Sequence, residues 1–239
     1  MSQIDYSIIM PTYNERENLP IIVYLICSEM QKCGENRFEI IIVDDSSPDG
    51  TQDVAKQLQT VFPNKIVLKS RKGKLGLGSA YIYGLTFARG DFVIIMDADL
   101  SHHPKFIPEM IRLQKKSNLD IVTGTRYRSG GGVCGWSWFR KLTSSGANVL
   151  ATTAIGNASS DMTGSFRLYR KAVLEKILPE VKAKGFSFQF EIIARAYKKG
   201  YTIGEVPITF ADRMFGSSKI GMKEYVGFIK TILLLVLTI

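Results

Sequence analysis

The sequence has few cysteines and no leader-like start. Its three cysteines, Cys27, Cys33 and Cys134, are odd in number and lack zinc-site spacing. We therefore expect reduced thiols in a cytosolic setting, which excludes a disulfide framework and a zinc domain. The first residues show no basic region followed by an apolar stretch, so the sequence predicts no secretory leader.

Repeats, low-complexity linkers and a disordered composition are absent as well. Hydrophobic residues make up 45% and charged residues 22% of the 239 positions, as in folded proteins. The excess charge is positive, +9, from 31 Lys and Arg against 22 Asp and Glu. A basic balance suits phosphate-bearing substrates, nucleic acid or an anionic membrane surface, and does not choose among them.

The sequence also lacks an apolar run long enough to span a bilayer. Residues 226–239 are almost entirely apolar, but only nine residues follow Lys230, and a spanning helix needs about 20. Two interpretations are open. The segment is either a buried terminal helix, or a helix that lies at a membrane interface or packs against a separate membrane subunit. The run 233–237 has no polar face, which favours the second.

The first hundred residues alternate between short apolar runs and amphipathic segments. They predict strands over 6–10, 38–43, 66–68 and 92–96, and helices over 19–30, 51–61 and 79–88. Strands without polar alternation, separated by helices, imply an α/β fold with a mostly parallel central sheet and helices on both faces. Right-handed crossovers place the carboxyl ends of such strands at one edge, where ligands bind.

The pattern beyond residue 120 is less regular. It predicts strands over 120–123, 166–169, 202–206 and 208–210, helices over 141–155 and 188–198, a glycine-rich loop over 127–138 and a polar loop over 212–221. We interpret residues 1–221 as one domain whose second half supplies further walls of a site. Residues 222–239 are the separate apolar helix.

Two aspartates, Asp97 and Asp99, follow the fourth predicted strand. Alternate residues of an extended segment point to the same side, so the two carboxylates repel each other unless a cation lies between them or one takes up a proton. Oxygen ligands alone suit Mg²⁺ or Mn²⁺, which keep part of their water and bind substrate phosphates. The pair therefore predicts a divalent metal site, against the alternative of a solvated turn.

Residues at the ends of the first two strands outline a nucleotide pocket. Tyr13 can stack on a base, and the carboxylates of Glu15 and Asp44 can accept hydrogen bonds from ribose or base groups. Glycines at 76 and 78 lack the third glycine of a dinucleotide fingerprint and follow the third strand, which disfavours a dehydrogenase.

Three cations are placed to bind phosphates. Arg126 follows the fifth predicted strand, and Arg213 and Lys219 lie in the polar loop together with small hydroxyl side chains. Arginine and lysine with small hydroxyls are the groups that a pyrophosphate clamp requires. The alternative is a solvated basic loop without a ligand.

Several motifs together resemble the family-2 glycosyltransferases of GT-A fold. These motifs lie at 11–15, 43–51, 96–100, 124–127, 161–167 and 206–210. A further motif at 212–219 resembles the dolichol-phosphate mannosyltransferases within that family, so the resemblance covers nearly the whole chain. It implies an inverting transfer of mannose from GDP-mannose to dolichyl phosphate, in support of protein glycosylation and GPI anchor biosynthesis, with no nucleic acid as partner.

The resemblance also implies roles by position. The nucleoside would be held by Pro11, Tyr13, Glu15, Ile42 and Asp44. The diphosphate would be held through Mg²⁺ or Mn²⁺ and by cations, at Asp97, Ala98, Asp99, Arg126, Arg213 and Lys219. Among these, the catalytic residues would be Asp99, Arg126 and Arg213. Relatives carry a metal-ligating glutamine where this chain has Ser101, so we expect water to replace that ligand here.

The acceptor is expected on the side of the glycine-rich loop. Arg128 and Arg140 would receive the dolichyl phosphate, and Gln189 and Glu191 would face the mannose or the acceptor. Trp136 and Trp138 would lie either at lipid headgroups or in the core. A phosphate acceptor has a second pKa of about 6, so it is ionised at neutral pH and needs no general base.

The expected location is the cytosolic face of the endoplasmic reticulum membrane, with small membrane-spanning regulatory subunits as partners; both follow from the resemblance. Two rival functions stay open. One is a dolichyl-phosphate glucosyltransferase that uses UDP-glucose, and the other is a nucleotide-binding membrane adaptor without catalysis. His102 and His103 are expected to serve the loop and cap before Pro104 rather than the metal.

Overall fold

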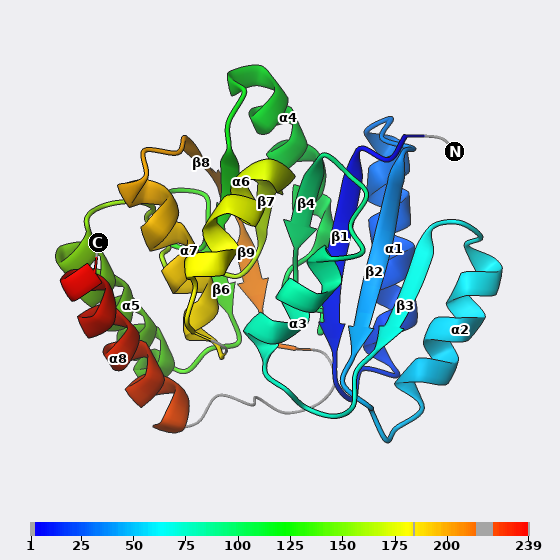
Figure 1. The fold of residues 1–239 in the computed structure, drawn as a ribbon, viewed down its shortest axis with the longest axis horizontal. Coiled ribbons are helices and arrows are strands. Elements are labelled where there is room, and N and C mark those ends of the chain that lie inside the picture. Colours follow the sequence, from blue (N-terminus) through cyan, green and yellow to red (C-terminus); the bar gives the residue numbers. More distant parts are fainter. Residues whose placement is uncertain (1–2, 184, 214–221, 239) are drawn as a thin grey trace.

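The computed structural model describes residues 3–183, 185–213 and 222–238. A seven-stranded sheet with the strand order β3-β2-β1-β4-β7-β5-β8 forms its centre, with helices on both faces (Figure 1). A second, two-stranded sheet pairs β6 with β9. The strands are β1 (Tyr6–Thr12), β2 (Phe38–Asp44), β3 (Ile66–Ser70), β4 (Phe92–Ile95), β5 (Ile121–Thr125), β6 (Gly132–Cys134), β7 (Arg167–Arg170), β8 (Ile203–Pro207) and β9 (Thr209–Ala211).

The helices connect these strands. They are α1 (Asn18–Lys32), α2 (Thr51–Val61), α3 (Leu77–Leu85), α4 (Ile107–Ser117), α5 (Trp138–Ile155), α6 (Lys171–Ile177), α7 (Ser187–Lys198) and α8 (Met222–Thr238). The expected α/β class with a mostly parallel sheet is confirmed, because β7 alone in the large sheet runs antiparallel to its neighbours β4 and β5. The parallel strands β1, β2, β3 and β4 therefore end at the same edge.

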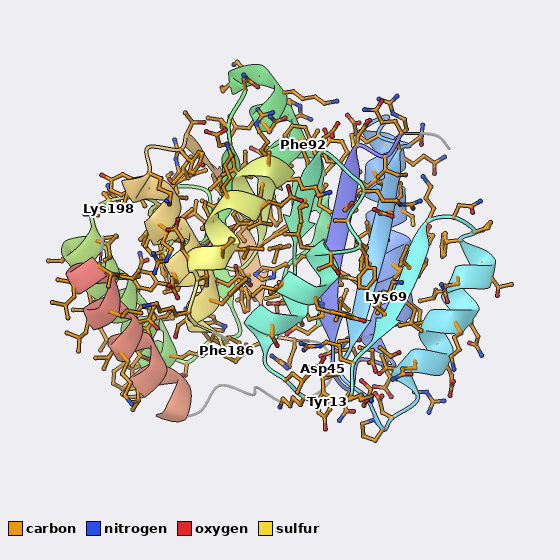
Figure 2. The ribbon with its side chains drawn as sticks, viewed as in Figure 1. Tyr13, Asp45, Lys69, Phe92, Phe186 and Lys198 are labelled. Carbon is orange, nitrogen blue, oxygen red and sulfur yellow. The ribbon has the colours of Figure 1, made fainter. Side chains whose placement is uncertain are left out.

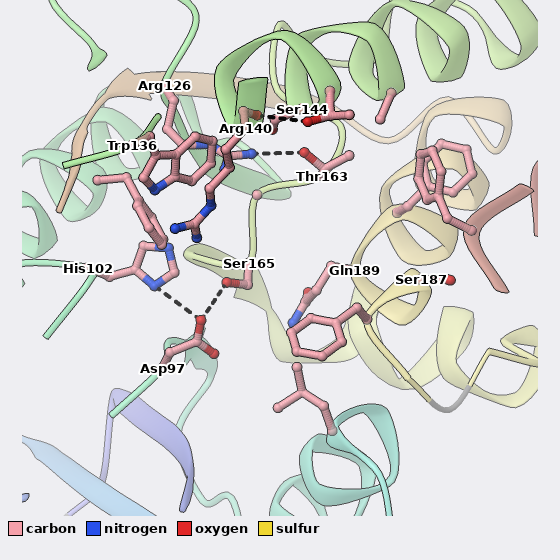
Figure 3. Close-up of a pocket in the computed structure, with 18 of the residues that line it drawn as sticks. Asp97, His102, Arg126, Trp136, Arg140, Ser144, Thr163, Ser165, Ser187 and Gln189 are labelled. Atoms are coloured by element: carbon pink, nitrogen blue, oxygen red, sulfur yellow. Dashed lines mark hydrogen bonds and ion pairs between the residues drawn. The ribbon is translucent and has the colours of Figure 1, made fainter. Parts of the chain in front are cut away.

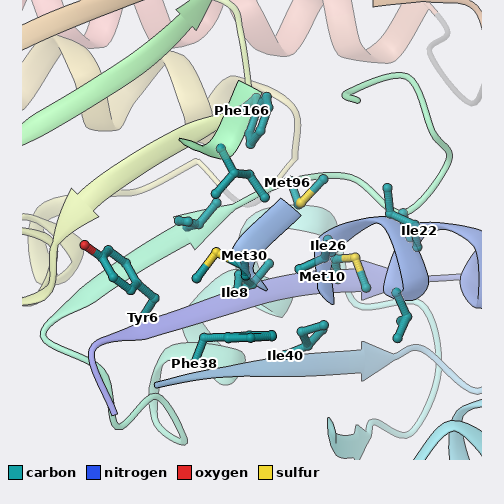
Figure 4. Packing of buried hydrophobic residues seen from close by; sticks show 14 of the residues in the cluster. Tyr6, Ile8, Met10, Ile22, Ile26, Met30, Phe38, Ile40, Met96 and Phe166 are labelled. Carbon is teal, nitrogen blue, oxygen red and sulfur yellow. The ribbon is translucent and has the colours of Figure 1, made fainter. Parts of the chain in front are cut away.

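Two apolar clusters cover the two faces of the sheet. Ile8 and Met10 of β1 pack with Ile22 and Ile26 of α1 on one face (Figure 4), whereas Ile9 belongs to the cluster on the other face. All five side chains are fully buried. Successive residues of a strand point to opposite faces, so a strand buried on both sides must be apolar throughout. This is why the continuous apolar runs predicted a parallel sheet correctly.

Three elements escaped the sequence analysis: α4, α6 and the short strand β6. Helix α4 buries Ile107, Met110, Ile111 and Gln114 at helical spacing, a stripe that the sequence analysis did not use. Strand β6 lies inside the segment expected to be a glycine-rich loop, because it is only three residues long and pairs solely with β9.

Helix α8 is buried on one face and exposed on the other. One face packs against α7 and α5: Ile232 and Leu235 are buried, and the Phe228 ring lies 5.1 Å from the Phe190 ring. The opposite face exposes apolar side chains, with Leu233 59% and Leu237 85% accessible. No helix in the described ranges is both long and apolar enough to cross a bilayer.

Paired alanine substitutions test whether α8 is an integral part of this domain. Leu235→Ala removes a fully buried side chain and is expected to lower the free energy of unfolding by about 2–5 kcal/mol. Val236→Ala changes the neighbouring exposed position and should cost within about 0.5 kcal/mol. Chemical denaturation measures both. Equal effects would mean that α8 does not pack as described.

Candidate functional site

Two cavities of about 210 Å³ each open at the carboxyl edge of the parallel strands. We call them the Tyr13 cavity, which Pro11, Tyr13 and Glu15 line, and the Trp136 cavity, which Trp136 and Arg140 line. In Figure 2, Tyr13 and Asp45 lie at this edge, while Phe92 lies towards the opposite edge of the sheet. A common wall separates the two cavities, formed by Leu77, Asp97, Asp99, Phe186 and Arg213.

Asp97 lies at the centre of this common wall. Its carboxylate accepts hydrogen bonds from the Tyr81 hydroxyl (3.1 Å) and the Ser165 hydroxyl (3.0 Å), and the His102 imidazole lies 3.6 Å away (Figure 3). Burial raises the pKa of Asp97, His102 lowers it, and the negative charge of Asp99 raises it further. The side chain keeps 29% of its surface accessible, so a cation can reach it and relieve the unfavourable charge.

Asp99 is held by a tight turn. Leu100 adopts a left-handed conformation with φ of 64°, which is strained for a residue with a branched side chain. The turn lets the backbone N–H of Ser101 donate to the Asp99 carboxylate at 3.1 Å. The other carboxylate oxygen lies 3.0 Å from Nη2 of Arg213. Both predicted metal ligands thus converge on the place where the two cavities meet.

The site offers two carboxylates to a cation and few other protein ligands. Among the described residues, no cluster of three or more His, Cys, Asp or Glu side chains could hold a metal. Mg²⁺ commonly binds through one or two carboxylates and completes its shell with water and substrate phosphates. The pair therefore fits a metal that arrives with a phosphorylated substrate. Ser101 is buried behind the turn, where its carbonyl accepts from the N–H of Ala211.

The Tyr13 cavity contains three of the five predicted nucleoside residues: Pro11, Tyr13 and Glu15. Ala98 lines it as well, and Lys74 lies 5.0 Å from the Tyr13 ring centroid. An aromatic ring, a carboxylate and a cation in one cavity are suited to a base, a ribose and a phosphate, respectively.

Ile42 and Asp44, which were predicted to hold the nucleoside, do not line this cavity in the structure. Ile42 is fully buried in the core below the sheet edge. Asp44 is also fully buried, and accepts hydrogen bonds from Thr12 at 2.9 Å and Gln52 at 2.7 Å. The next residue, Asp45, lines the cavity instead. The sequence analysis missed it because neighbouring residues of an extended chain face opposite ways.

Asp45 is fixed in place by a buried ion pair. The Arg71 guanidinium donates to both carboxylate oxygens, at 2.6 and 2.7 Å. The same guanidinium donates to the Ser79 hydroxyl at 2.7 Å. The basic segment before α3, which the sequence left without a firm role, thus orients an acid in the Tyr13 cavity.

Arg126 enters the Trp136 cavity in a rigid, charged state. It makes a two-point contact with Asp161, at 2.6 and 2.8 Å, and also donates to Thr163 at 2.8 Å. Burial lowers the pKa of Arg126, but the Asp161 carboxylate more than offsets this and raises it. Burial likewise opposes the charge of Asp161, yet Arg126 holds the pKa of Asp161 below its ordinary value. The guanidinium is therefore a permanent cation of fixed orientation.

Arg140 and Trp136 complete the basic side of this cavity. The Arg140 guanidinium lies 4.2 Å from the Trp136 ring centroid, and that of Arg126 lies 5.4 Å from it. Arg140 also pairs with Asp212 at 2.6 Å. Trp136 is 9% accessible and belongs to the cavity, whereas Trp138 at the start of α5 is 75% accessible.

Of the other predicted acceptor residues, only Gln189 reaches the cavity. Arg128 is exposed, lines neither cavity, and lies 3.8 Å from Glu205. Glu191 is fully buried on another side of α7, where it pairs with Arg195 at 2.8 Å. Glu191 therefore does not face the cavity as predicted, whereas the contact of Arg128 with the acceptor stays a prediction. Lys219 lies outside the described residues.

Tyr81, Ser165 and Asp161 had no assigned role in the sequence analysis, and His102 was expected to serve the loop and cap instead. Tyr81, Ser165 and His102 surround Asp97, and Asp161 orients Arg126. Ser165 and Asp161 lie in the motif 161–167, so a signal was present. The two histidines have different surroundings. The His103 ring accepts a hydrogen bond from the N–H of Lys105 and caps the turn as expected, whereas His102 faces the Trp136 cavity.

The chain is similar to two curated proteins. A polyprenol monophosphomannose synthase from Mycolicibacterium smegmatis is 40% identical over 219 residues, which cover 89% of this chain and 79% of that protein. A dolichol-phosphate mannosyltransferase from Pyrococcus furiosus is 39% identical over 230 residues, which cover 95% of this chain and 62% of that protein.

The fold has solved counterparts. A mannosyltransferase from Pyrobaculum calidifontis, solved with GDP-Man and Mn²⁺, matches with a TM-score of 0.62 at 18% identity, over 99% of this chain and 64% of that one. The expected GT-A fold is thereby confirmed. Residues 7–178 match the family described as Glycosyl transferase family 2. Together with the relative that is 40% identical, this match shows that the chain belongs to glycosyl transferase family 2.

Proposed function

We propose that this chain transfers mannose from GDP-mannose to dolichyl phosphate or a closely related polyprenyl phosphate, with inversion at the anomeric carbon. The observation that carries the proposal is the meeting of two cavities at the Asp97–Asp99 pair. One cavity suits a nucleotide and the other a sugar and a phosphate. The names of the two relatives, both mannose transferases or synthases for a polyprenol or dolichol phosphate, support this substrate class.

In this proposal the GDP moiety occupies the Tyr13 cavity. The base stacks on Tyr13, with Asp45 and Glu15 as acceptors for its N–H and ribose hydroxyl groups. Asp97 and Asp99 hold Mg²⁺ or Mn²⁺, which neutralises the diphosphate of the leaving GDP. Arg213, paired with Asp99, lies beside that diphosphate, and Lys219 is proposed to follow it. The presence of Mn²⁺ with GDP-Man in the Pyrobaculum enzyme supports this donor and metal.

The acceptor phosphate is proposed to bind at Arg126 and Arg140. It already carries negative charge at neutral pH, so the chain needs cations rather than a general base. Asp161 holds Arg126 in a buried ion pair, while Arg140 pairs with the exposed Asp212. A phosphate can compete with Asp212 for Arg140 and so approach the sugar from the side opposite the nucleotide.

The lipid part of the acceptor is proposed to enter along α5 and α8. Helix α5 turns Arg140, Ser144 and Ala147 towards the cavity and exposes Phe139 and Leu142 on its other side. With the exposed apolar face of α8, which packs beside α5 (Figure 1), these side chains form an apolar surface. We propose that it rests on the cytosolic face of the endoplasmic reticulum membrane or on small membrane-spanning subunits.

Replacement of Asp97 tests the metal site. Because burial raises the pKa of Asp97 above 3.8, the ionised carboxylate opposes folding, and the stability of the folded state falls as the pH rises through the raised pKa. Asp97→Asn is therefore expected to raise the Tm of the metal-free chain at pH 7, by an amount that shrinks towards pH 4.

The same variant should lose metal-dependent nucleotide binding. GDP and Mn²⁺ at about 100 times Kd should stabilise the unmodified chain by about 2.7 kcal/mol, a Tm rise of about 5–10 °C. We expect less than about 1 °C for Asp97→Asn, and the same for the unmodified chain with EDTA. Equal stabilisation of both chains by GDP and Mn²⁺ would contradict the assignment.

A transfer assay with full-length chain, dolichyl phosphate and either GDP-mannose or UDP-glucose tests the proposed reaction. Turnover of GDP-mannose is expected, and preferred turnover of UDP-glucose would favour the rival glucosyltransferase. Arg140→Met should raise the KM for dolichyl phosphate about 10- to 100-fold, because a charge-assisted contact contributes about 1.5–3 kcal/mol. Arg170→Met, at a cation paired with Asp120 outside both cavities, is the matched control and should change that KM less than about twofold.

Flotation with vesicles that contain dolichyl phosphate tests the membrane surface. Leu142→Glu places a charge on the apolar surface of α5. It should weaken vesicle binding roughly 10- to 100-fold, because burying one leucine side chain contributes about 1.5–3 kcal/mol. Val61→Glu introduces the same charge at another exposed apolar side chain, 67% accessible at the end of α2, and should leave binding unchanged. Equal loss in both variants would point to non-specific adsorption.

A further inference from the structure

Gln189 is a buried amide without an internal partner. It lies in the first turn of α7, is 2% accessible, and lines the Trp136 cavity. Within the part of the chain that the structure describes, neither its Oε1 nor its Nε2 has a hydrogen-bond partner. In Figure 3 the side chain extends from α7 towards the open space that Asp97 and Ser165 also face.

The position of this amide is fixed by its backbone. The carbonyl oxygen of Gln189 accepts a hydrogen bond from the fully buried Arg167 guanidinium, and the preceding Phe188 ring stacks on Tyr81, whose hydroxyl holds Asp97. The first turn of α7 is thereby tied to the same aspartate that forms the wall between the cavities. The side-chain amide projects into the cavity from a rigid support.

An amide buried without partners costs folding free energy, since its donor and its acceptor have both left water. An apolar side chain of the same shape would avoid this cost. Because the amide lines the cavity, a molecule bound there can supply the missing hydrogen-bond partners.

The chemistry of the amide limits what that molecule can be. A glutamine side chain both donates and accepts, and so its full satisfaction requires a group that also does both. A phosphate oxygen only accepts, and an isoprenoid chain does neither. Hydroxyl groups on a sugar ring fit, and the remaining walls near the amide are the apolar residues Leu77, Phe186 and Phe190. Arg126 and Arg140 are the two cations of the cavity that can bind a phosphate. They lie in the connection between β5 and β6 and in α5, not in α7.

We infer that Gln189 binds a hydroxyl of the transferred sugar and so determines which sugar the enzyme accepts, rather than binding the acceptor phosphate. This inference rests on the proposed function, because it places the donor sugar in the Trp136 cavity. It changes the expected role of Gln189 from an acceptor-side residue to a specificity-determining residue for the donor.

The test uses full-length chain, dolichyl phosphate, GDP-mannose and four GDP-mannose analogues that each lack one ring or C6 hydroxyl. In the unmodified chain, the analogue without the hydroxyl that Gln189 binds should lose about 10- to 100-fold in kcat/KM, since it leaves a buried amide unpaired. In Gln189→Met, which keeps the length of the side chain but removes both polar atoms, this one loss should shrink to less than about threefold. The losses for the other three analogues should stay as they are.

Two controls separate recognition from structure. Gln114→Met changes another buried glutamine, which lies in α4 and whose Nε2 donates to the carbonyl of Leu119. That variant should have a lower Tm and an unchanged analogue profile. Gln189→Met should keep or raise the Tm and retain the affinity for free GDP. Gln189→Leu provides a second removal of the amide if the methionine variant folds poorly.

The outcomes distinguish this inference from the proposed function. If the unmodified chain transfers mannose but all four analogue losses persist in Gln189→Met and Gln189→Leu, the inference is overturned and the proposed function stands. A rise confined to the KM for dolichyl phosphate would also overturn it, since Gln189 would then bind the acceptor. If the unmodified chain transfers no mannose, the proposed function fails, and the assignment of Gln189 to mannose fails with it.

Discussion

The site depends on the negative charge that Asp97 and Asp99 bring to the wall between the two cavities. The fold brings the charges there because β4 ends where the parallel strands share an edge, and a strained turn at Leu100 directs Asp99 to the same place. Tyr81, Ser165 and the Ser101 N–H donate hydrogen bonds to the two carboxylates, but burial and, to a lesser extent, the repulsion between the carboxylates still raise the pKa of Asp97. A divalent cation relieves this repulsion, and each half of the site then has a distinct task.

The two halves differ in how they hold charge. In the Tyr13 cavity an acid, Asp45, is locked by a buried arginine; in the Trp136 cavity a cation, Arg126, is locked by a buried acid, Asp161. Each ion pair costs folding free energy, because both of its charges have left water. This cost is consistent with a charge whose fixed position serves to orient a substrate. A nucleotide with N–H donors is suited to the first cavity and an anionic acceptor to the second. In the proposed reaction, cations on both sides of the sugar would reduce the direct repulsion between diphosphate and acceptor.

Sequence patterns predicted the order of strands and helices in the first hundred residues and brought Tyr13, Glu15, Asp97, Arg126 and Arg140 to one site. The patterns did not predict which of two neighbouring side chains faces the cavity. Asp44 and Asp45 both follow an apolar strand, and only packing decides which one reaches the cavity. Gln189 and Glu191 are separated by about 200° around α7, so that one faces the cavity and the other the core. The role of Asp161 was hidden because its partner is distant in sequence and their contact depends on the fold.

The most direct test of the central claim is a structure of the chain with Mg²⁺ and GDP-mannose in the absence of acceptor. Our account predicts a metal ion about 2.0–2.1 Å from oxygens of Asp97 and Asp99, the guanine beside Tyr13 and Asp45, and the mannose in the Trp136 cavity within reach of Gln189. A metal bound away from both carboxylates, or a nucleotide and sugar that together occupy only one of the two cavities, would contradict it.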